Sequence, residues 1–321
     1  MKTTGEMRFE LKKPDLTACR AGNTGVEGVW HWDSGQPGRH VMVSALIHGN
    51  ELCGAWALKQ LLESGIKPVA GSLTLAFCNL AAFDRFDPER HDDSRFVDED
   101  MNRIWADNKL ADPTTSERQR ANQLLPYVKK ADWLLDLHSM HEPGAPLILT
   151  GLQARNLNLA RELGAPQHII VDAGHSEGVR MRDYGRFGDL GDTQSRSLLV
   201  ECGFHGEIAS LDVALDVTAR FLSLSDVVGT HIIPSDWYSS SVNPSVAVQV
   251  TQAVVAQSMD MRFVENWQGL QRIPSAGTLL AIDGERQYVT PYDDCTLIMP
   301  SLRQLRPGVT VMRLAQSISA I

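Results

Sequence analysis

The sequence predicts an α/β protein with a largely parallel sheet, followed by a smaller β-rich domain. Apolar runs of strand length recur along residues 1–239, and segments with helical spacing lie between them. Continuous apolar strands that alternate with helices are typical of a parallel sheet covered on both faces. The pattern changes over residues 240–321, where short alternating runs and turn residues dominate.

Six apolar runs are expected to form the strands of the sheet. Each is rich in aliphatic residues and is bounded by polar or turn residues, as buried strands are. In chain order, they span residues 40–47, 72–80, 132–140, 146–151, 167–173 and 197–203.

Four segments between and after these runs are expected to form helices. They span residues 51–63, 113–130, 153–163 and 207–224. Asp112 before Pro113 is a signal for a helix start, and Gly164 is expected to end the third helix. In the tail, Gly277, Gly284 and Gly308 are expected to form turns between short strands.

Composition excludes several classes of partner. The chain of 321 residues suits one large domain and a smaller one. A net charge of -9 without a basic block argues against binding to nucleic acid or to an anionic membrane. Residues 1–15 contain no signal-peptide core, and no apolar run is long enough to span a bilayer. Five scattered cysteines without a CxxC pair favour a reduced, cytoplasmic protein, and a homo-oligomer is left open.

Polar residues stand at the carboxyl ends of three expected strands. His48 and Glu51 follow the first strand, His138 lies near the end of the third, and Glu201 lies near the end of the sixth. In open α/β sheets, ligands bind beyond the carboxyl ends of the strands, where residues distant in sequence meet. We therefore expect these four side chains to form one site.

The residue types in this set are those of a catalytic zinc site. His48 and Glu51 are three residues apart, with Gly49 to permit a tight turn, so one helical turn can put both on one face. With His138 they make a His₂Glu set for one zinc ion, which leaves a position for water or substrate. Zinc lowers the pKa of bound water to about 7 and polarises a carbonyl, so Glu201 is expected to move the proton. Asp136 shares the strand face of His138 and could support that histidine, face solvent or serve as a capping residue.

One short segment between expected strands adds groups that recognise anions. It contains Arg95, Asn102 and Arg103. Arginine recognises a carboxylate through a planar fork, and asparagine adds an oriented amide. A metal hydrolase that cleaves an N-acyl amino acid needs one such group to polarise the scissile carbonyl and others to hold the carboxylate. The alternative is that Arg103 pairs with Asp98 or Asp100 in the same loop.

In order and spacing, the segments "HGNE", "DEDMNR", "DLH" and "VECG" resemble the succinylglutamate desuccinylase/aspartoacylase family, which is related to the M14 zinc carboxypeptidases. The resemblance covers about residues 38–205. It implies a zinc-carboxypeptidase-like fold, with a mixed, mostly parallel sheet flanked by helices and a smaller C-terminal β-rich domain. It also implies a zinc-dependent amidohydrolase that cleaves the amide of a small anionic N-acyl amino acid, such as a succinylglutamate- or N-acetylaspartate-like substrate.

The same resemblance assigns roles to individual positions. The residues that match the zinc ligands are His48, Glu51 and His138. Glu201 matches the general acid/base, and Arg95 matches the arginine that helps to polarise the carbonyl. Asn102 and Arg103 match the pair that holds the substrate carboxylate. Residues 174–196 do not match a substrate-binding loop of the family, so the candidates there rest on chemistry alone: Arg180, Arg182, Tyr184 and Arg196.

Three other functions compete with this hypothesis. "GHSEG", residues 174–178, would make Ser176 the nucleophile of a serine hydrolase, but the glycine-rich and charged residues that follow do not predict the helix that such an elbow needs. A zinc carboxypeptidase shares the ligand pattern and the Asn-Arg pair; the small C-terminal domain favours the deacylase, because it could narrow the site. A non-catalytic binding protein is disfavoured by Glu201 beside the three expected ligands.

Overall fold

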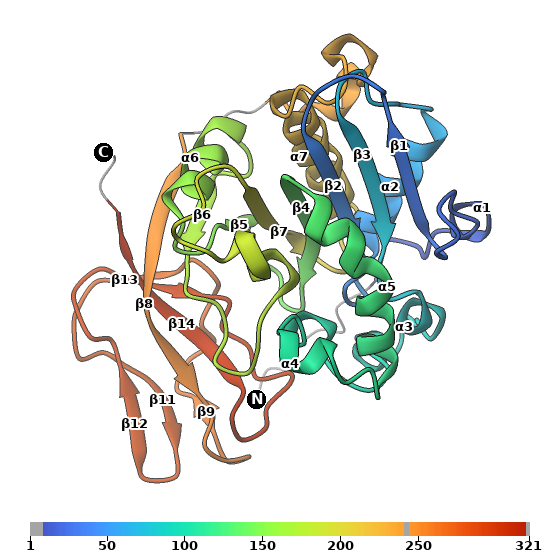
Figure 1. Cartoon of the computed structure of the whole chain (residues 1–321). Coiled ribbons are helices and arrows are strands. Elements are labelled where there is room, and N and C mark those ends of the chain that lie inside the picture. Colours follow the sequence, from blue (N-terminus) through green and yellow to red (C-terminus); the bar gives the residue numbers. More distant parts are fainter. Residues whose placement is uncertain (1–8, 241–243, 319–321) are drawn as a thin grey trace.

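The computed structural model describes residues 9–240 and 244–318, and its main feature is an 11-stranded sheet (Figure 1). The strand order is β1-β3-β2-β4-β7-β5-β6-β8-β14-β13-β10. The strands before residue 240 are β1 (Val29–Asp33), β2 (His40–Ala45), β3 (Ser72–Phe77), β4 (Trp133–Met140), β5 (Leu147–Leu149), β6 (His168–Val171) and β7 (Arg196–Phe204). Strands β3, β2, β4 and β7 run parallel to one another, so their carboxyl ends meet at one edge.

Helices cover both faces of this sheet. The helices are α1 (Thr17–Arg20), α2 (Leu52–Glu63), α3 (Leu80–Asp84), α4 (Asp107–Leu110), α5 (Ser116–Lys130), α6 (Ala154–Leu163) and α7 (Ala209–Leu224). Apolar residues of α2 and α7 pack against Val43, Leu135 and Val200 of the sheet. Residues of α5 pack against Met42 and Leu134, which point to the other face because strand residues alternate. The predicted α/β fold with a mostly parallel sheet flanked by helices is confirmed.

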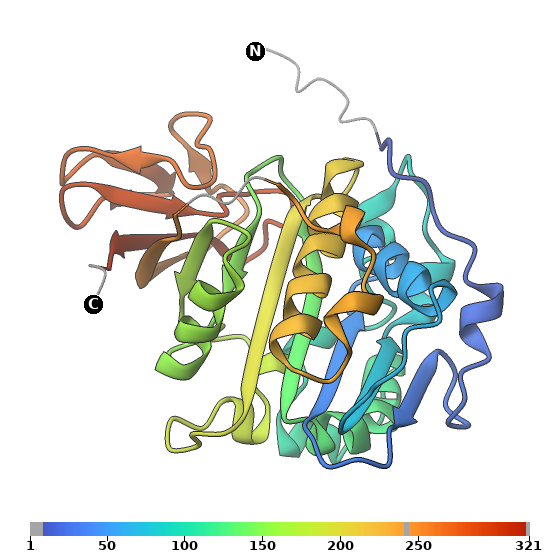
Figure 2. The ribbon, with the colours of Figure 1, turned by 90° about the horizontal axis from the view of Figure 1, so that it is seen from above.

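The C-terminal segment continues the same sheet. Strand β8 (Val246–Val255) pairs in parallel with β6 and antiparallel with β14 (Thr310–Ser317), and β13 (Cys295–Ile298) and β10 (Arg272–Ile273) follow. Strands β9 (Arg262–Phe263), β11 (Leu279–Asp283) and β12 (Arg286–Val289) form a second, three-stranded sheet. Figure 2 shows these orange and red strands at one end of the molecule, away from α2 and α7. The smaller β-rich part is confirmed.

Several sequence-based bounds can be compared with the structure. The predicted turn glycines Gly277, Gly284 and Gly308 have φ angles of 74°, 60° and 89°, which glycine adopts without strain. The second helix begins at Ser116 and not near Asp112, because the side chain of Thr115 accepts the cap hydrogen bond from the Arg118 amide. The edge strand β1, antiparallel to β3, was not predicted.

Some predictions lie on residues outside the described part of the chain. Residues 1–8, where no signal peptide is expected, and residues 319–321 are among them, as are residues 241–243 beside the expected domain boundary at 239/240. The division into two domains therefore stays a prediction. Among the described residues, none of the helices combines the length and the apolar character needed to cross a bilayer. All five cysteines are free and buried.

Candidate metal and catalytic site

The turn after β2 brings His48 and Glu51 together. His48 Nδ1 lies 2.7 Å from Glu51 Oε1, and both side chains are buried. Gly49 makes this turn possible because the surrounding backbone is close: an added Cβ atom would lie 2.4 Å from atoms of Ala82 and Phe83. The φ angle of Gly49 is not positive, so lack of space, and not the conformational freedom expected from the sequence, requires glycine here.

The neighbouring strand β4 adds His138 to this pair. His138 Nδ1 lies 2.8 Å from Glu51 Oε2. One ligand atom from each of His48, Glu51 and His138 lies within 4.8 Å of the other two, and all three residues are buried. The structure thus brings together the three side chains expected to form a metal site.

Each histidine contacts a second carboxylate through the ring nitrogen that does not face Glu51. Asp136 Oδ2 lies 2.8 Å from His138 Nε2, and Asp136 Oδ1 accepts a hydrogen bond from the Ser44 hydroxyl. Asp100 Oδ1 lies 3.0 Å from His48 Nε2. Such partners fix the orientation of an imidazole and leave its other nitrogen for a metal. Asp136 therefore contacts His138 and does not face solvent, which decides among the roles left open by the sequence.

The charges in this cluster fit a cation. Burial alone would raise the pKa of Glu51, but the charges of His48 and His138 hold it well below its usual range. Burial opposes a charge on His138, but Asp136 and Glu51 hold its pKa well above the usual value. The proton held by the His138 imidazole therefore offsets the negative charge of the buried carboxylates Glu51 and Asp136. Two imidazole nitrogens and one carboxylate are the protein donors of many catalytic zinc sites, so the residues fit such an ion.

Glu201 lies on β7, directly beside His138 on β4 in the sheet register. It is buried, and Glu201 Oε2 has no hydrogen-bond partner among the residues that the structure describes. Burial and the charge of Glu51 raise the pKa of Glu201 to about 8, against the opposing charges of His138 and Arg95. A buried carboxyl group without a partner, next to a metal-binding set, is suited to proton transfer.

Arg95 is held at the edge of the same cluster. Arg95 Nη2 donates a 3.1 Å hydrogen bond to Asp100 Oδ2, and Nη1 lies 3.6 Å from Glu51 Oε1. The backbone also couples the two segments, because the Gly49 amide donates to the Arg95 carbonyl. The guanidinium is thus fixed beside the candidate metal ligands, as the sequence predicted.

Asn102 and Arg103 lie in a short 3₁₀ turn that Asp100 caps. The Met181 amide donates to Asn102 Oδ1, which leaves the Asn102 NH₂ group available. Arg103 Nη1 donates to the Asn102 carbonyl and lies 4.0 Å from Asp100 Oδ2. No ion pair between Arg103 and Asp98 is found in the described chain, and Arg103 Nε has no hydrogen-bond partner there. Of the two alternative partners of Arg103 within its loop, Asp100 therefore forms an ion pair with it, at 4.0 Å, and Asp98 does not.

The remaining candidates from residues 174–196 bind other parts of the protein. Arg182 is fully buried, and its hydrogen bonds go to Asp183, the Thr150 carbonyl and Ser197. The Tyr184 hydroxyl donates to Asp107.

Arg180 and Arg196 also bind groups of the protein outside the candidate site. Arg180 forms ion pairs with Asp172 and Asp183. Arg196 donates to the carbonyls of Thr193, Gln194 and Ser195 at the amino end of β7, the end opposite to Glu201. The structure does not bring Arg196 to the site, because a residue at the start of a parallel strand lies at the other edge of the sheet.

The nucleophile elbow proposed around Ser176 is absent from the described structure. Residues 172–180 form a loop after β6, and only a three-residue 3₁₀ helix, Met181–Asp183, follows. The strand–turn–helix arrangement that would expose the Ser176 hydroxyl is missing.

Sequence reasoning missed a group of histidines beside Arg95. His141 Nε2 lies 3.1 Å from Arg95 Nη1 and 3.1 Å from Gln304 Nε2 of the C-terminal segment. His141 Nδ1 lies 3.1 Å from Asp92 Oδ1 and 3.3 Å from His205 Nε2. The available signals were that His141 lies three residues after His138 and His205 four residues after Glu201, whereas Gln304 is distant in the sequence.

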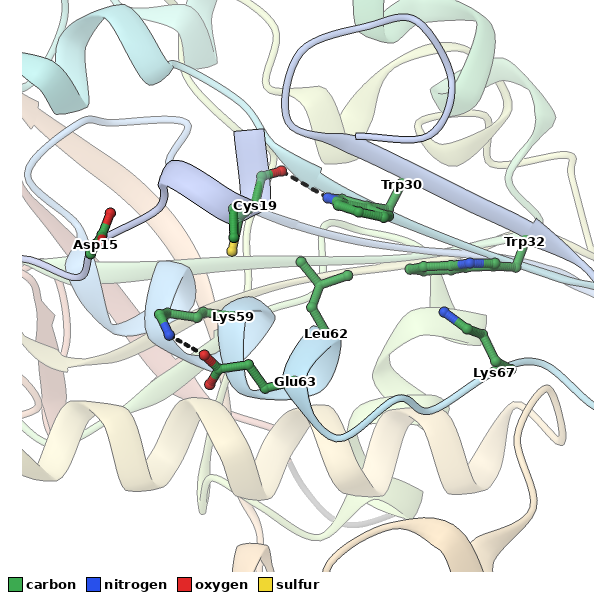
Figure 3. A pocket seen from close by; sticks show the side chains of 9 residues that line it. Asp15, Cys19, Trp30, Trp32, Lys59, Leu62, Glu63 and Lys67 are labelled. Atoms are coloured by element: carbon green, nitrogen blue, oxygen red, sulfur yellow. Dashed lines mark hydrogen bonds and ion pairs between the residues drawn. The ribbon is translucent and has the colours of Figure 1, made fainter. Parts of the chain in front are cut away.

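A separate hollow of about 330 Å³ lies between α1, β1 and α2 (Figure 3). Trp30, Trp32 and Leu62 line it, and the amine of Lys67 lies over the Trp32 ring at 3.6 Å from its centroid. None of the candidate catalytic or metal-binding residues lines this hollow. It is therefore distinct from the site described above.

Comparison with known proteins shows which family the chain resembles. Residues 37–193 match the family model described as the succinylglutamate desuccinylase/aspartoacylase catalytic domain. Over these residues the chain is similar to the succinylglutamate desuccinylase/aspartoacylase family. The matched residues include His48, Glu51, Asn102 and His138, and Glu201 follows eight residues after their end. A search of curated protein sequences found no match.

Solved structures share the fold of the chain. A succinylglutamate desuccinylase from Vibrio cholerae is 18% identical with a TM-score of 0.66, over 91% of this chain and 86% of that one. The corresponding protein from Vibrio parahaemolyticus is 16% identical with a TM-score of 0.65, over 91% and 87%. An ectoine utilization protein from Ruegeria pomeroyi, solved with bound product, is 15% identical with a TM-score of 0.62, over 89% and 88%. At these identities the likeness shows the fold alone.

Proposed function

We propose that this protein is a zinc-dependent amidohydrolase that removes the acyl group from a small anionic N-acyl amino acid. The observation that supports this best is the buried set of His48, Glu51 and His138, with the unpartnered carboxyl group of Glu201 on the adjacent strand. The similarity of residues 37–193 to a desuccinylase/aspartoacylase family model also supports a deacylase. We also expect one zinc ion per chain and a cytoplasmic protein.

His48, Glu51 and His138 would hold the ion, and Asp136 and Asp100 would orient the two imidazoles. When bound, zinc lowers the pKa of water to about 7 and polarises a carbonyl oxygen. The chain's own residues must do the remainder of the chemistry: move the proton, stabilise the developing negative charge and orient the substrate.

Glu201 is the group suited to move the proton. It would accept the proton of the attacking water while the water oxygen forms a bond to the acyl carbon. It would then deliver that proton to the amine nitrogen as the C–N bond breaks, which releases a carboxylate and an amine. Burial, the largest cause of the raised pKa of Glu201, helps this carboxyl group to hold the proton between these two steps.

Arg95 and the Asn102–Arg103 pair would bind the two ends of the substrate. Arg95 lies within 3.6 Å of Glu51 and can stabilise negative charge that develops on the scissile carbonyl oxygen. Arg103 pairs with Asp100 only at 4.0 Å, and the Asn102 amide group beside it is available, so both can hold the α-carboxylate.

The alternative of a zinc carboxypeptidase is less consistent with the C-terminal segment. Gln304 contacts His141 beside Arg95, and Arg303 donates to Glu142 just after β4. The C-terminal segment thus lies against the rim of the candidate site, which favours a small substrate over a long peptide. The serine hydrolase alternative has no supporting geometry around Ser176.

The deciding experiment compares N-acyl amino acids with their α-carboxamides, using zinc-loaded protein. Loss of the charged hydrogen bonds should lower kcat/KM for the amide by about 10-fold or more. Arg103→Lys should mainly raise KM, and Arg95→Ala should mainly lower kcat. Arg262→Lys, on exposed strand β9, is the matched control and should change neither. Equal hydrolysis of acid and amide would show that the proposed substrate class is wrong.

A further inference from the structure

His141, the first residue after β4, contacts Arg95 of the candidate site. Its Nε2 atom lies 3.1 Å from Arg95 Nη1 and 3.1 Å from Gln304 Nε2. An arginine side chain carries only hydrogen-bond donors, so His141 Nε2 must be the acceptor and bears no proton. A neutral imidazole with a bare Nε2 atom carries its proton on Nδ1. The contact with Arg95 therefore assigns the tautomer of His141.

The groups around the other ring nitrogen fit a proton at that position. Asp92 Oδ1 lies 3.1 Å from His141 Nδ1 and accepts its hydrogen bond. His205 Nε2 lies 3.3 Å from the same atom, and His205 Nδ1 lies 2.7 Å from the Ser139 hydroxyl oxygen. A carboxylate beside one ring nitrogen fixes the proton there and leaves the other nitrogen as an acceptor. Asp92 thus determines that a bare nitrogen of His141 faces Arg95.

The charges around this pair are consistent with that assignment. Burial lowers the pKa of His141 and outweighs the hydrogen bond to Asp92, and the charge of Arg95 acts in the same direction as burial. Burial would raise the pKa of Asp92, but its contacts with His141 and His91 hold it below its usual range. Asp92 Oδ2 also lies 3.7 Å from Arg303 Nη1. A neutral ring beside an ionised carboxylate is therefore the favoured state of this pair.

Two different acceptors hold the Arg95 guanidinium. Asp100 Oδ2 accepts from Nη2 at 3.1 Å, and His141 Nε2 accepts from Nη1 at 3.1 Å. Contacts at both terminal nitrogens fix the plane of the guanidinium. Arg95 Nε has no hydrogen-bond partner among the residues that the structure describes. The guanidinium is thus fixed in direction and keeps one N–H group for a ligand.

His141 also keeps Arg95 from pairing more closely with a candidate metal ligand. Glu51 Oε1 lies 3.6 Å from Arg95 Nη1, the same nitrogen that His141 binds. A closer ion pair would direct the charge of the guanidinium to Glu51, because the attraction between charges grows as they approach. A neutral acceptor at Nη1 orients this nitrogen without adding a further negative charge. The positive charge of Arg95 therefore stays available to the scissile carbonyl.

We propose that His141 is a positioning residue for Arg95. Asp92 fixes the proton of His141 on Nδ1, and Nε2 holds the guanidinium in the direction that stabilises negative charge on the scissile carbonyl oxygen. His141 acts through Arg95 and exchanges no proton with the substrate. This inference rests on the proposed function for the reaction, but the tautomer of His141 and its contact with Arg95 can be measured without substrate.

The kinetic test is a double-mutant cycle on the zinc-loaded full chain, with an N-acyl amino acid as substrate. His141→Phe keeps a ring but removes the acceptor, so kcat should fall by about 10–100-fold, the cost of losing a hydrogen bond to a charged group, while KM changes little. In Arg95→Ala protein, the same substitution should lower kcat by less than about threefold, because the group that His141 positions is gone. His141→Gln supplies an amide oxygen as acceptor and should recover part of kcat. His231→Phe, at an exposed histidine, is the matched control and should change neither constant.

A substrate-free measurement separates this inference from the proposed function. Nitrogen-detected NMR of protein labelled at the histidine rings should show His141 neutral, with its proton on Nδ1, and the loss of its signals in His141→Gln assigns them. Arg95→Ala should shift the Nε2 signal, because that atom loses its donor. Asp92→Asn should weaken the preference for the Nδ1 proton.

The possible results distinguish the two claims. If the spectra give this tautomer and its dependence on Arg95 but no N-acyl amino acid is hydrolysed, the proposed reaction is wrong and the positioning of Arg95 stands. If His141 carries its proton on Nε2, or is charged at neutral pH, the inference is overturned. It is also overturned if the effects of His141→Phe and Arg95→Ala on kcat are additive, since His141 then has only a packing role.

Discussion

Replacement of Asp136 by asparagine should weaken metal binding without changing the fold. Asp136 is fully buried, and its Oδ2 atom lies 2.8 Å from His138 Nε2. Asparagine keeps the size of the side chain but removes its negative charge. His138 would then lose the charged partner that fixes its ring and makes its Nδ1 atom a better donor to a cation.

Two independent estimates give the magnitude of this effect. A hydrogen bond to a charged group contributes about 1.5–3 kcal/mol, which corresponds to about a 10–100-fold change in affinity. Loss of the outer partner of a metal-ligating histidine typically costs about 10–100-fold in metal affinity. Ser44→Ala removes only the hydroxyl that supports Asp136 and should cost less.

The assay is competition for zinc between the protein and a chromophoric chelator. Circular dichroism and the melting temperature of the metal-free proteins report whether each variant is folded. Asp260→Asn removes the same charge at an exposed position and should leave affinity unchanged. If folded Asp136→Asn binds zinc as tightly as the wild type, His138 does not need its carboxylate partner, and the arrangement deduced for the site is wrong.

Three further outcomes are expected. Glu201→Gln should retain zinc while turnover falls by about 10²–10⁴-fold, and near-normal turnover would exclude Glu201 as the proton carrier. Gly49→Ala should lose metal and lower the melting temperature, because its Cβ atom would lie 2.4 Å from backbone atoms; Gly269→Ala, with nothing within 4 Å, should change neither. Zinc affinity should continue to rise as the pH increases above 6.5, because the raised pKa of His138 lets protons compete with the metal for its ring at those pH values. An affinity that levels off at pH 6.5 would contradict this expectation.

The sequence contained most of the information needed to locate the metal site. His48, Glu51, His138 and Glu201 each end or follow a strand of a parallel sheet, so the edge at which they meet follows from strand direction alone. The same rule excludes Arg196, which begins its strand. The guanidinium of Arg196 suggested a role in substrate binding, but its position at the first residue of β7 places it away from the site.

Other contacts had no local signal. Asp100 was weighed only as a partner of Arg103, yet it also contacts His48 and Arg95, because the geometry of its turn decides which side chains its carboxylate reaches. Arg313 and His175 are 138 residues apart, and their contact depends on how β14 joins the main sheet. Edge strand β1 was missed because only its antiparallel pairing with β3 defines it.

The most direct test of the account is a zinc titration of metal-free protein, with amine release from an N-acyl amino acid as the readout. If His48, Glu51 and His138 hold one catalytic ion, the rate should rise linearly with added zinc and reach a plateau at one equivalent per chain. His48→Ala and His138→Ala should abolish that rise. Full activity in the metal-free protein, or an unchanged zinc dependence in both variants, would contradict the central claim.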